Sequence, residues 1–146
     1  MSPANGLKIL FVAGFGPIAK EPRTSKTFYT DMLGLPLDTM PGSDDYLHTE
    51  KLDGVRHFAV WPLKEAAQSC FGRDAWPADV PEPQAWLEFD VEDVAAASAV
   101  LKSRGCRLLV DARAEPWGQT VTRLLSPEGV LVGVTYTPWM RGKTNE

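Results

Sequence analysis

The chain carries the same order of structural elements twice, and this repetition constrains its fold more than any other feature of the 146 residues. An apolar run at residues 7–13 and an alternating run at residues 85–91 predict a strand at the start of each half. An amphipathic helical pattern follows each strand and ends at a glycine, Gly34 in the first half and Gly105 in the second. Three shorter strand-like runs follow each helix, so a duplicated βαβββ unit is the simplest explanation.

Turn signals separate the strand-like runs within each half. Asp53-Gly54 lies between two runs of the first half, and Asp-Gly in such a position is a strong hairpin signal. A Ser-Pro-Glu-Gly turn at residues 126–129 lies between the last two runs of the second half. The runs that follow the two helices are expected at residues 35–37, 46–52, 55–63, 106–110, 120–125 and 130–136.

The two halves are expected to share one domain of the α+β class. We place the domain at residues 1–146, with one βαβββ module at 7–63, the second at 85–138, and a connector at 64–84. Prolines and a glycine dominate the connector, for which a single helical turn at residues 65–70 is expected. Two such modules side by side form an open, cupped mixed sheet, and its uncovered face is a central trough suited to a ligand.

Composition excludes several classes of partner. The net charge of −4, without any basic run, argues against binding to nucleic acid. No apolar run approaches the length of about 20 residues that a membrane span needs, and the first residues lack a secretory signal. The two cysteines, Cys70 and Cys106, have no metal-binding or redox spacing, which is typical of reduced thiols in a cytoplasmic protein.

Three segments of the chain resemble the vicinal oxygen chelate superfamily, which holds glyoxalase I, bleomycin resistance proteins and extradiol dioxygenases. They are SKTFYTDMLG at residues 25–34, FDVEDV at 89–94 and LSPEGVL at 125–131. The resemblance implies the duplicated βαβββ fold, a small-molecule ligand in the trough, and a homodimer. It does not fix the chemistry, because this fold supports several reactions.

The resemblance also places four positions at which family enzymes hold a divalent metal ion with His, Glu or Gln. By strand register they fall near Gly14 and at Ala59, Trp86 and Gly133. None of these four residues can coordinate a metal ion, because glycine and alanine have no donor atom and an indole N–H only donates. We therefore expect no metal cofactor at the usual family positions, and whether the protein is an enzyme stays open.

The first functional expectation is metal-independent binding of a small aromatic or cationic molecule in the trough, as in bleomycin resistance proteins. Strand parity aims Trp61 and His57 into the trough from the first half, and Trp86 and Glu88 from the second. Aromatic walls with nearby carboxylates, Glu50 among them, would hold such a molecule by stacking and charge. The ligand-binding residues are expected to be Trp61, Trp86, His57, Glu50, Glu88 and His48.

The alternative expectation uses the hairpin around Asp53-Gly54, which carries both histidines of the chain. His48 and Glu50 share one strand face, and a two-residue turn would place His57 opposite Glu50. Two imidazoles and a carboxylate can bind Zn²⁺, Fe²⁺ or Mn²⁺, or can transfer protons. The protein would then be a metal-dependent lyase or dioxygenase with displaced ligands. A polar cluster that only supports the hairpin, and a scaffold with an occluded trough, are the remaining alternatives.

Overall fold

The computed structural model describes residues 7–141, which form one eight-stranded sheet with helices on both faces. None of the helices in this part of the chain has the length and apolar character that crossing a bilayer requires. In chain order the elements are β1 (Ile9–Ala19), α1 (Pro22–Lys26), the π-helical turn η2 (Thr27–Met32), β2 (Asp38–Met40), β3 (Ser43–Thr49), β4 (Phe58–Pro62), α2 (Leu63–Phe71), β5 (Ala85–Val91), α3 (Val94–Ser103), β6 (Val110–Ala114), β7 (Thr120–Leu125), β8 (Leu131–Tyr136) and the 3₁₀ turn η3 (Pro138–Met140).

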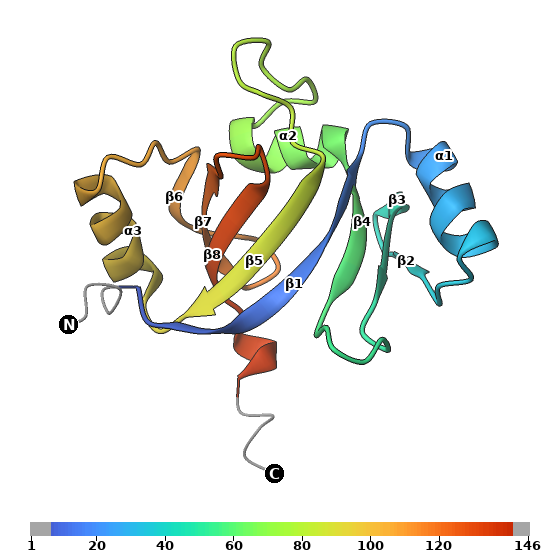
Figure 1. Ribbon diagram of the computed structural model, residues 1–146, viewed down its shortest axis with the longest axis horizontal. Coiled ribbons are helices and arrows are strands. Elements are labelled where there is room, and N and C mark those ends of the chain that lie inside the picture. The colour runs from blue at the N-terminus through green and yellow to red at the C-terminus, as the bar shows by residue number, and fades with distance from the viewer. Residues whose placement is uncertain (1–6, 142–146) are drawn as a thin grey trace.

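The sheet confirms the mixed α+β fold and the βαβββ order of both halves. The strand order is β2-β3-β4-β1-β5-β8-β7-β6, so each half contributes four neighbouring strands. β1 is parallel to β4 and β5 is parallel to β8, whereas β1 and β5 pair antiparallel where the two halves meet. Figure 1 shows β1 and β5 in the middle of the molecule, with α1 and α3 on opposite sides of them.

The two predicted helices cover what we call the outer face of the sheet. In the first half, Tyr29 of η2 packs against Phe58 and Val60 of β4. In the second half, Leu101 of α3 packs in one cluster with Val134 of β8. Both helices end near a glycine with positive φ, Gly34 at +74° and Gly105 at +87°, which agrees with the predicted helix ends.

The opposite, inner face is covered in part by α2, which the sequence indicated only as a turn at residues 65–70. The helix is longer, Leu63–Phe71, and its small residues Ala66, Ala67 and Cys70 are buried. They pack in one core cluster with Trp61 and Trp86 on the inner face. The prolines of the connector made the whole segment look irregular. They all lie after Phe71, however, so they do not interrupt this helix.

The β3–β4 hairpin has the register that the sequence predicted. His48 pairs with Ala59 and Thr49 pairs with Phe58, and continuing this register places Glu50 opposite His57. The strands are shorter than the predicted runs at 46–52 and 55–63, because the ladder ends at Thr49 and Phe58. Gly54 lies at the turn with a φ of +92°, a conformation that favours glycine.

Two of the predicted strands were placed wrongly. The runs at 35–37 and 106–110 were expected as strands, but the ladders begin at Asp38 in β2 and at Val110 in β6. Leu35, Leu37 and Leu108 pack in the clusters beneath the outer-face helices, whereas Leu109 packs in the inner-face cluster with α2. An apolar run therefore indicated burial correctly but did not reveal where strand pairing begins.

Close approach of backbones requires glycine where the two halves join. A Cβ atom at Gly16 would clash with the carbonyl oxygen of Ala59 on β4. A Cβ atom at Gly14 would lie 2.5 Å from the carbonyl oxygen of His57 and 2.9 Å from the indole of Trp86. These two glycines therefore allow β1 to lie against both β4 and the Trp86 side chain.

We expect Gly16→Ala to lower the free energy of unfolding by about 3 kcal/mol or more, because the clashing atom belongs to the backbone. Gly129→Ala is the matched control. Gly129 has a φ of +86° and open space around it, so this variant should lose only about 1 kcal/mol. Urea unfolding of both variants measures the difference, and equal losses would contradict the proposed close packing of β1 on β4.

Candidate functional site

The β3–β4 hairpin brings His48, Glu50 and His57 together, and we call these three residues the hairpin cluster. Alternation along β3 puts residues 48 and 50 on one face, and the hairpin register adds residue 57 from the approach to β4. Their potential ligand atoms all lie within 4.8 Å of one another. The His57 ring lies 6.1 Å from that of Trp86, so the cluster borders the inner face of the sheet.

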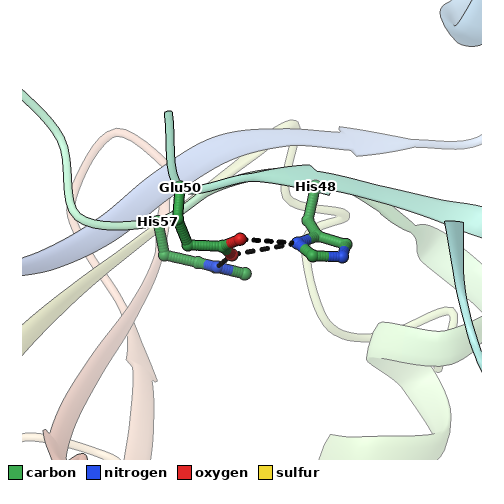
Figure 2. Close-up of side chains that lie close together, drawn as sticks. All are labelled: His48, Glu50 and His57. Carbon is green, nitrogen blue, oxygen red and sulfur yellow. Dashed lines mark hydrogen bonds and ion pairs between the residues drawn. The ribbon is translucent and has the colours of Figure 1, made fainter. Parts of the chain in front are cut away.

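Glu50 is the centre of the hairpin cluster, as Figure 2 shows. Its Oε2 accepts hydrogen bonds from Nδ1 of His48 at 2.9 Å and from Nδ1 of His57 at 2.5 Å. A carboxylate only accepts, so this network assigns the Nδ1–H tautomer to both histidines. The Glu50 side chain is 50% exposed, whereas those of His48 and His57 are 17% and 19% exposed, which leaves the carboxylate accessible from solvent.

Tyr46 belongs to this site, although the sequence analysis did not select it. Its hydroxyl group lies 2.8 Å from Nε2 of His57 and donates to it in the tautomer that Glu50 imposes. The signal was present in the sequence, because residues 46, 48 and 50 alternate along one strand and therefore share a face.

Burial raises the pKa of Tyr46 well above its usual value, and the negative charges of Glu88 and Glu50 add to the increase. Arg123 acts in the opposite direction but does not cancel the shift. The phenol therefore stays protonated near neutral pH and remains able to donate to His57. The influence of Glu88 and Arg123 also shows that the second half of the chain acts on this site.

The second half contributes a buried ion pair between Glu88 and Arg123. Oε2 of Glu88 accepts from Arg123 at 3.0 Å, and Oε1 accepts from Gln119 at 3.1 Å. The Arg123 side chain is 2% exposed, and its guanidinium lies 4.8 Å from the ring centre of Trp61. Glu88, expected as a ligand-binding carboxylate, thus lies on the inner face but is held by Arg123 and Gln119. Neither of these partners was selected from the sequence.

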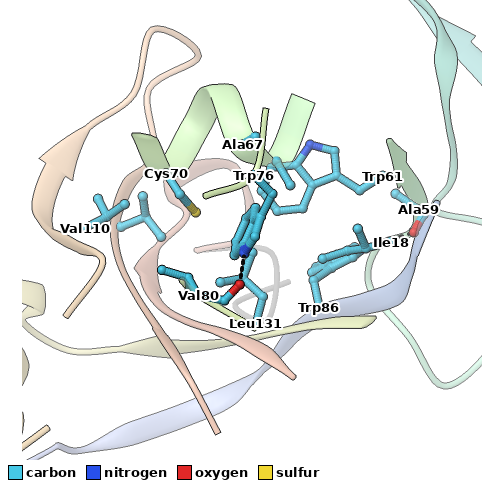
Figure 3. Packing of buried hydrophobic residues seen from close by; sticks show 12 residues of the cluster. Ile18, Ala59, Trp61, Ala67, Cys70, Trp76, Val80, Trp86, Val110 and Leu131 are labelled. Carbon is cyan, nitrogen blue, oxygen red and sulfur yellow. Dashed lines mark hydrogen bonds between the residues drawn. The ribbon is translucent and has the colours of Figure 1, made fainter. Parts of the chain in front are cut away.

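The two tryptophans that were expected to line the trough lie in the core beneath α2. Trp61 is 9% exposed and Trp86 is 4% exposed, and their rings meet edge to face at 6.3 Å. The indole N–H of Trp86 donates to the carbonyl oxygen of Ala59 at 2.9 Å. Figure 3 shows both rings packed among side chains of this cluster, including Trp76 and Ala67, so neither offers an open face for stacking.

The structure shows what surrounds two of the positions at which the family resemblance expects a metal ligand, Gly14 and Gly133. The Trp86 indole lies against Gly14, where an added Cβ would come within 2.9 Å of the ring. At Gly133 an added Cβ would come within 2.8 Å of Cγ of Glu88, which occupies that space. The donor atoms are missing at these positions, and larger side chains from neighbouring strands fill the volume, so the residues present do not fit a metal ion.

Acidification should reveal the hydrogen bonds to Glu50. Partial burial raises the pKa of this carboxyl group, but hydrogen bonds and charge from His48 and His57 outweigh it, so the pKa lies below the usual 4.5. The stabilisation is therefore complete above that value and is lost as the pH falls through the folded pKa. Between pH 5 and pH 3 we expect wild type to lose more unfolding free energy than Glu50→Gln. The difference should stay below about 1 kcal/mol, because Glu50 is half exposed.

Urea unfolding at several pH values in this window measures the effect. Parallel pH profiles for wild type and Glu50→Gln would contradict the assigned hydrogen bonds.

Comparisons with known proteins agree with this fold. The family model described as the Glyoxalase/Bleomycin resistance protein/Dioxygenase superfamily matches residues 15–134. A superfamily member from Vibrio splendidus 12B01 is similar in structure, with a TM-score of 0.55 and 15% identity, covering 86% of this chain and 97% of that chain. No curated protein matched.

Two enzymes with solved structures are similar over part of their length. An extradiol ring-cleaving dioxygenase from B. fuscum has a TM-score of 0.57 and 19% identity, covering 90% of this chain and 33% of that chain. The Mn(II)-bound glyoxalase from Novosphingobium aromaticivorans has a TM-score of 0.55 and 15% identity, covering 93% and 40%. The present chain thus spans less than half of either protein, and at such identities the likeness concerns the fold alone.

The duplicated βαβββ order, the sheet that joins the two modules through β1 and β5, and a family match over most of the chain lead to one conclusion. The chain belongs to the glyoxalase/bleomycin resistance protein/dioxygenase superfamily.

Proposed function

We propose that this protein binds a divalent transition-metal ion at the hairpin cluster and presents it to a small organic molecule on the inner face. The observation that carries this proposal is the convergence of two imidazoles and one carboxylate within 4.8 Å. Two histidines and one carboxylate with open positions form a set that binds Fe²⁺, Zn²⁺ or Mn²⁺. The reaction that the family resemblance implies for such a site is that of a metal-dependent lyase or dioxygenase.

The distances within the cluster suit an ion of this size. Metal–ligand bonds of 2.0–2.1 Å in a tetrahedral site separate the donor atoms by about 3.3 Å. The nitrogen–oxygen contacts of 2.5 and 2.9 Å in the hairpin cluster are hydrogen bonds, and they need to open by less than about 1 Å. The half-exposed Glu50 side chain can make this movement because solvent lies on one side of it.

The charge around the cluster also favours a cation. Glu50, Glu65 and Glu88 all act on Tyr46, and Arg123 is the one positive charge among the groups that shift its pKa. Arg123 is paired with Glu88, so its charge is largely compensated locally. An ion at Glu50 would thus enter a region of net negative charge.

Metal-ion binding is tested on untagged, chelator-treated protein by isothermal titration with Zn²⁺, Co²⁺ and Mn²⁺. We expect about one ion per chain and a rise in melting temperature, because an ion that binds only the folded state stabilises it. His48→Ala and Glu50→Gln should each abolish both effects. Asp45→Asn, which removes an exposed carboxylate from the same strand, should change neither.

Absence of binding by the wild type would overturn the proposed metal site. So would unchanged binding by both His48→Ala and Glu50→Gln, because the ion would then lie elsewhere.

Metal-independent binding of a small cationic molecule is the second candidate function. It is favoured by the positions at which the family resemblance expects a metal ion, because Gly14 lies against the Trp86 indole and Gly133 lies against Glu88. The accessible carboxylate and the stacked rings of His48 and His57, 5.6 Å apart, would then contact the ligand.

A thermal-shift screen of organic cations in the presence of chelator distinguishes this function. A cation that raises the melting temperature must do so without metal, and the rise must disappear in Glu50→Gln.

The proposal includes a homodimer formed through the outer face. Val12, Phe15 and Phe28 are 43%, 42% and 45% exposed on β1 and η2. Phe15 contacts Phe58, and a chain of ring contacts through Tyr29 continues to Phe28, so these aromatic side chains are contiguous. Exposed apolar surface that is continuous in this way supports contact with a second copy.

Light scattering coupled to size exclusion tests the homodimer. The wild type should elute with twice the chain mass, and the double variant Phe15→Lys/Phe28→Lys should elute with the mass of one chain, because two charges per copy would be buried. Thr24→Lys on α1, an exposed polar site, is the control and should leave the dimer intact. A monomeric wild type across the accessible concentration range would contradict the dimer.

A further inference from the structure

The two histidines of the hairpin cluster are held differently. His57 uses both ring nitrogens, with Nδ1 bonded to Glu50 and Nε2 bonded to Tyr46. His48 uses only Nδ1, and its Nε2 has no hydrogen-bond partner within residues 7–141. The ring of Tyr46 also stacks on that of His57, at 6.2 Å and 23° between planes. Tyr46 thus restrains the position and the rotation of one imidazole but does not hydrogen-bond to the other.

We propose that Tyr46 is the positioning residue of the metal site, which fixes the His57 ring so that Nδ1 faces the ion. This inference rests on the proposed metal site and assigns a role that the three ligands alone do not explain. Metal-binding histidines in proteins commonly bond through their second nitrogen to an outer partner, which sets the ring orientation and the tautomer. Tyr46 stands in that position relative to His57.

The same contact holds His57 with and without an ion. Without an ion, Nδ1 carries the proton that it donates to Glu50, and Nε2 accepts the hydroxyl proton of Tyr46. An ion on Nδ1 needs the lone pair of that nitrogen, so the ring proton then resides on Nε2. A hydroxyl group can accept as well as donate. The 2.8 Å contact therefore persists with its direction reversed, and the ring need not move.

Tyr46 is suited to an outer position and not to direct coordination. Its hydroxyl is directed at Nε2, on the far side of the His57 ring from the nitrogen that faces Glu50.

The test is the Zn²⁺ affinity of Tyr46→Phe, which keeps all three ligands and the aromatic ring. We expect this variant to bind about 10- to 100-fold more weakly than wild type, the usual cost of removing an outer partner of a metal ligand. Tyr29→Phe is the matched control, because Tyr29 lies in the same half but packs on the outer face. Its Zn²⁺ affinity should equal that of wild type.

Nuclear magnetic resonance of the imidazole nitrogens distinguishes a positioning role from a purely structural one, because a structural role alone would not change the exchange rate of the His57 Nε2–H signal. In Zn²⁺-loaded wild type, His57 should show an Nε2–H signal that exchanges slowly with water, because Tyr46 accepts it. The signal should exchange rapidly in Tyr46→Phe, while the His48 signals stay unchanged. If the variant does not fold, the wild-type spectrum still decides, since a rapidly exchanging His57 Nε2–H overturns the proposal.

The possible failures can be told apart. Equal Zn²⁺ affinity in wild type and Tyr46→Phe overturns the role of Tyr46 and leaves the metal site standing. Absence of Zn²⁺ binding by the wild type overturns the proposed metal site, and with it the role of Tyr46.

Discussion

The packing of Trp86 where the two modules join is the constraint on which the rest of the structure depends. Its indole lies against Gly14 and Gly16 of β1, and its N–H bonds to the carbonyl oxygen of Ala59 on β4. One side chain of β5 thus connects the second module to two strands of the first. Any side chain at either glycine would separate these strands, so the join depends on glycine as much as on tryptophan.

This packing also determines where chemistry can occur. The Trp86 ring and α2 fill the middle of the inner face, where family enzymes hold their metal ion, and the residues at those positions carry no donor atoms. The half-exposed carboxylate of Glu50 lies at the hairpin, where two imidazoles converge on it, whereas Glu88 on the inner face is paired with Arg123. The chain has the superfamily fold, and the site that we propose lies at the hairpin beside the joining strands.

Local patterns predicted the hairpin cluster well and its surroundings poorly. Alternation along one strand and the Asp53-Gly54 turn were enough to place His57 opposite Glu50, because both rules act over a few residues. Arg123 of one module contacts Trp61 of the other. Local sequence patterns cannot predict contacts between residues so far apart in the chain. The burial of Trp61 beneath α2 escaped the sequence analysis for the same reason.

The sequence by itself determined the duplicated βαβββ order, the ends of both main helices and which side chains share a strand face. These features follow from backbone geometry and from the period of apolar residues, which act within one segment. Only the tertiary structure decided that α2 covers the inner face, that Trp86 packs against Gly14 and Gly16, and that Tyr46 hydrogen-bonds His57. Those outcomes depend on which surfaces meet after the chain has folded, and close packing of large side chains leaves room for only one such arrangement.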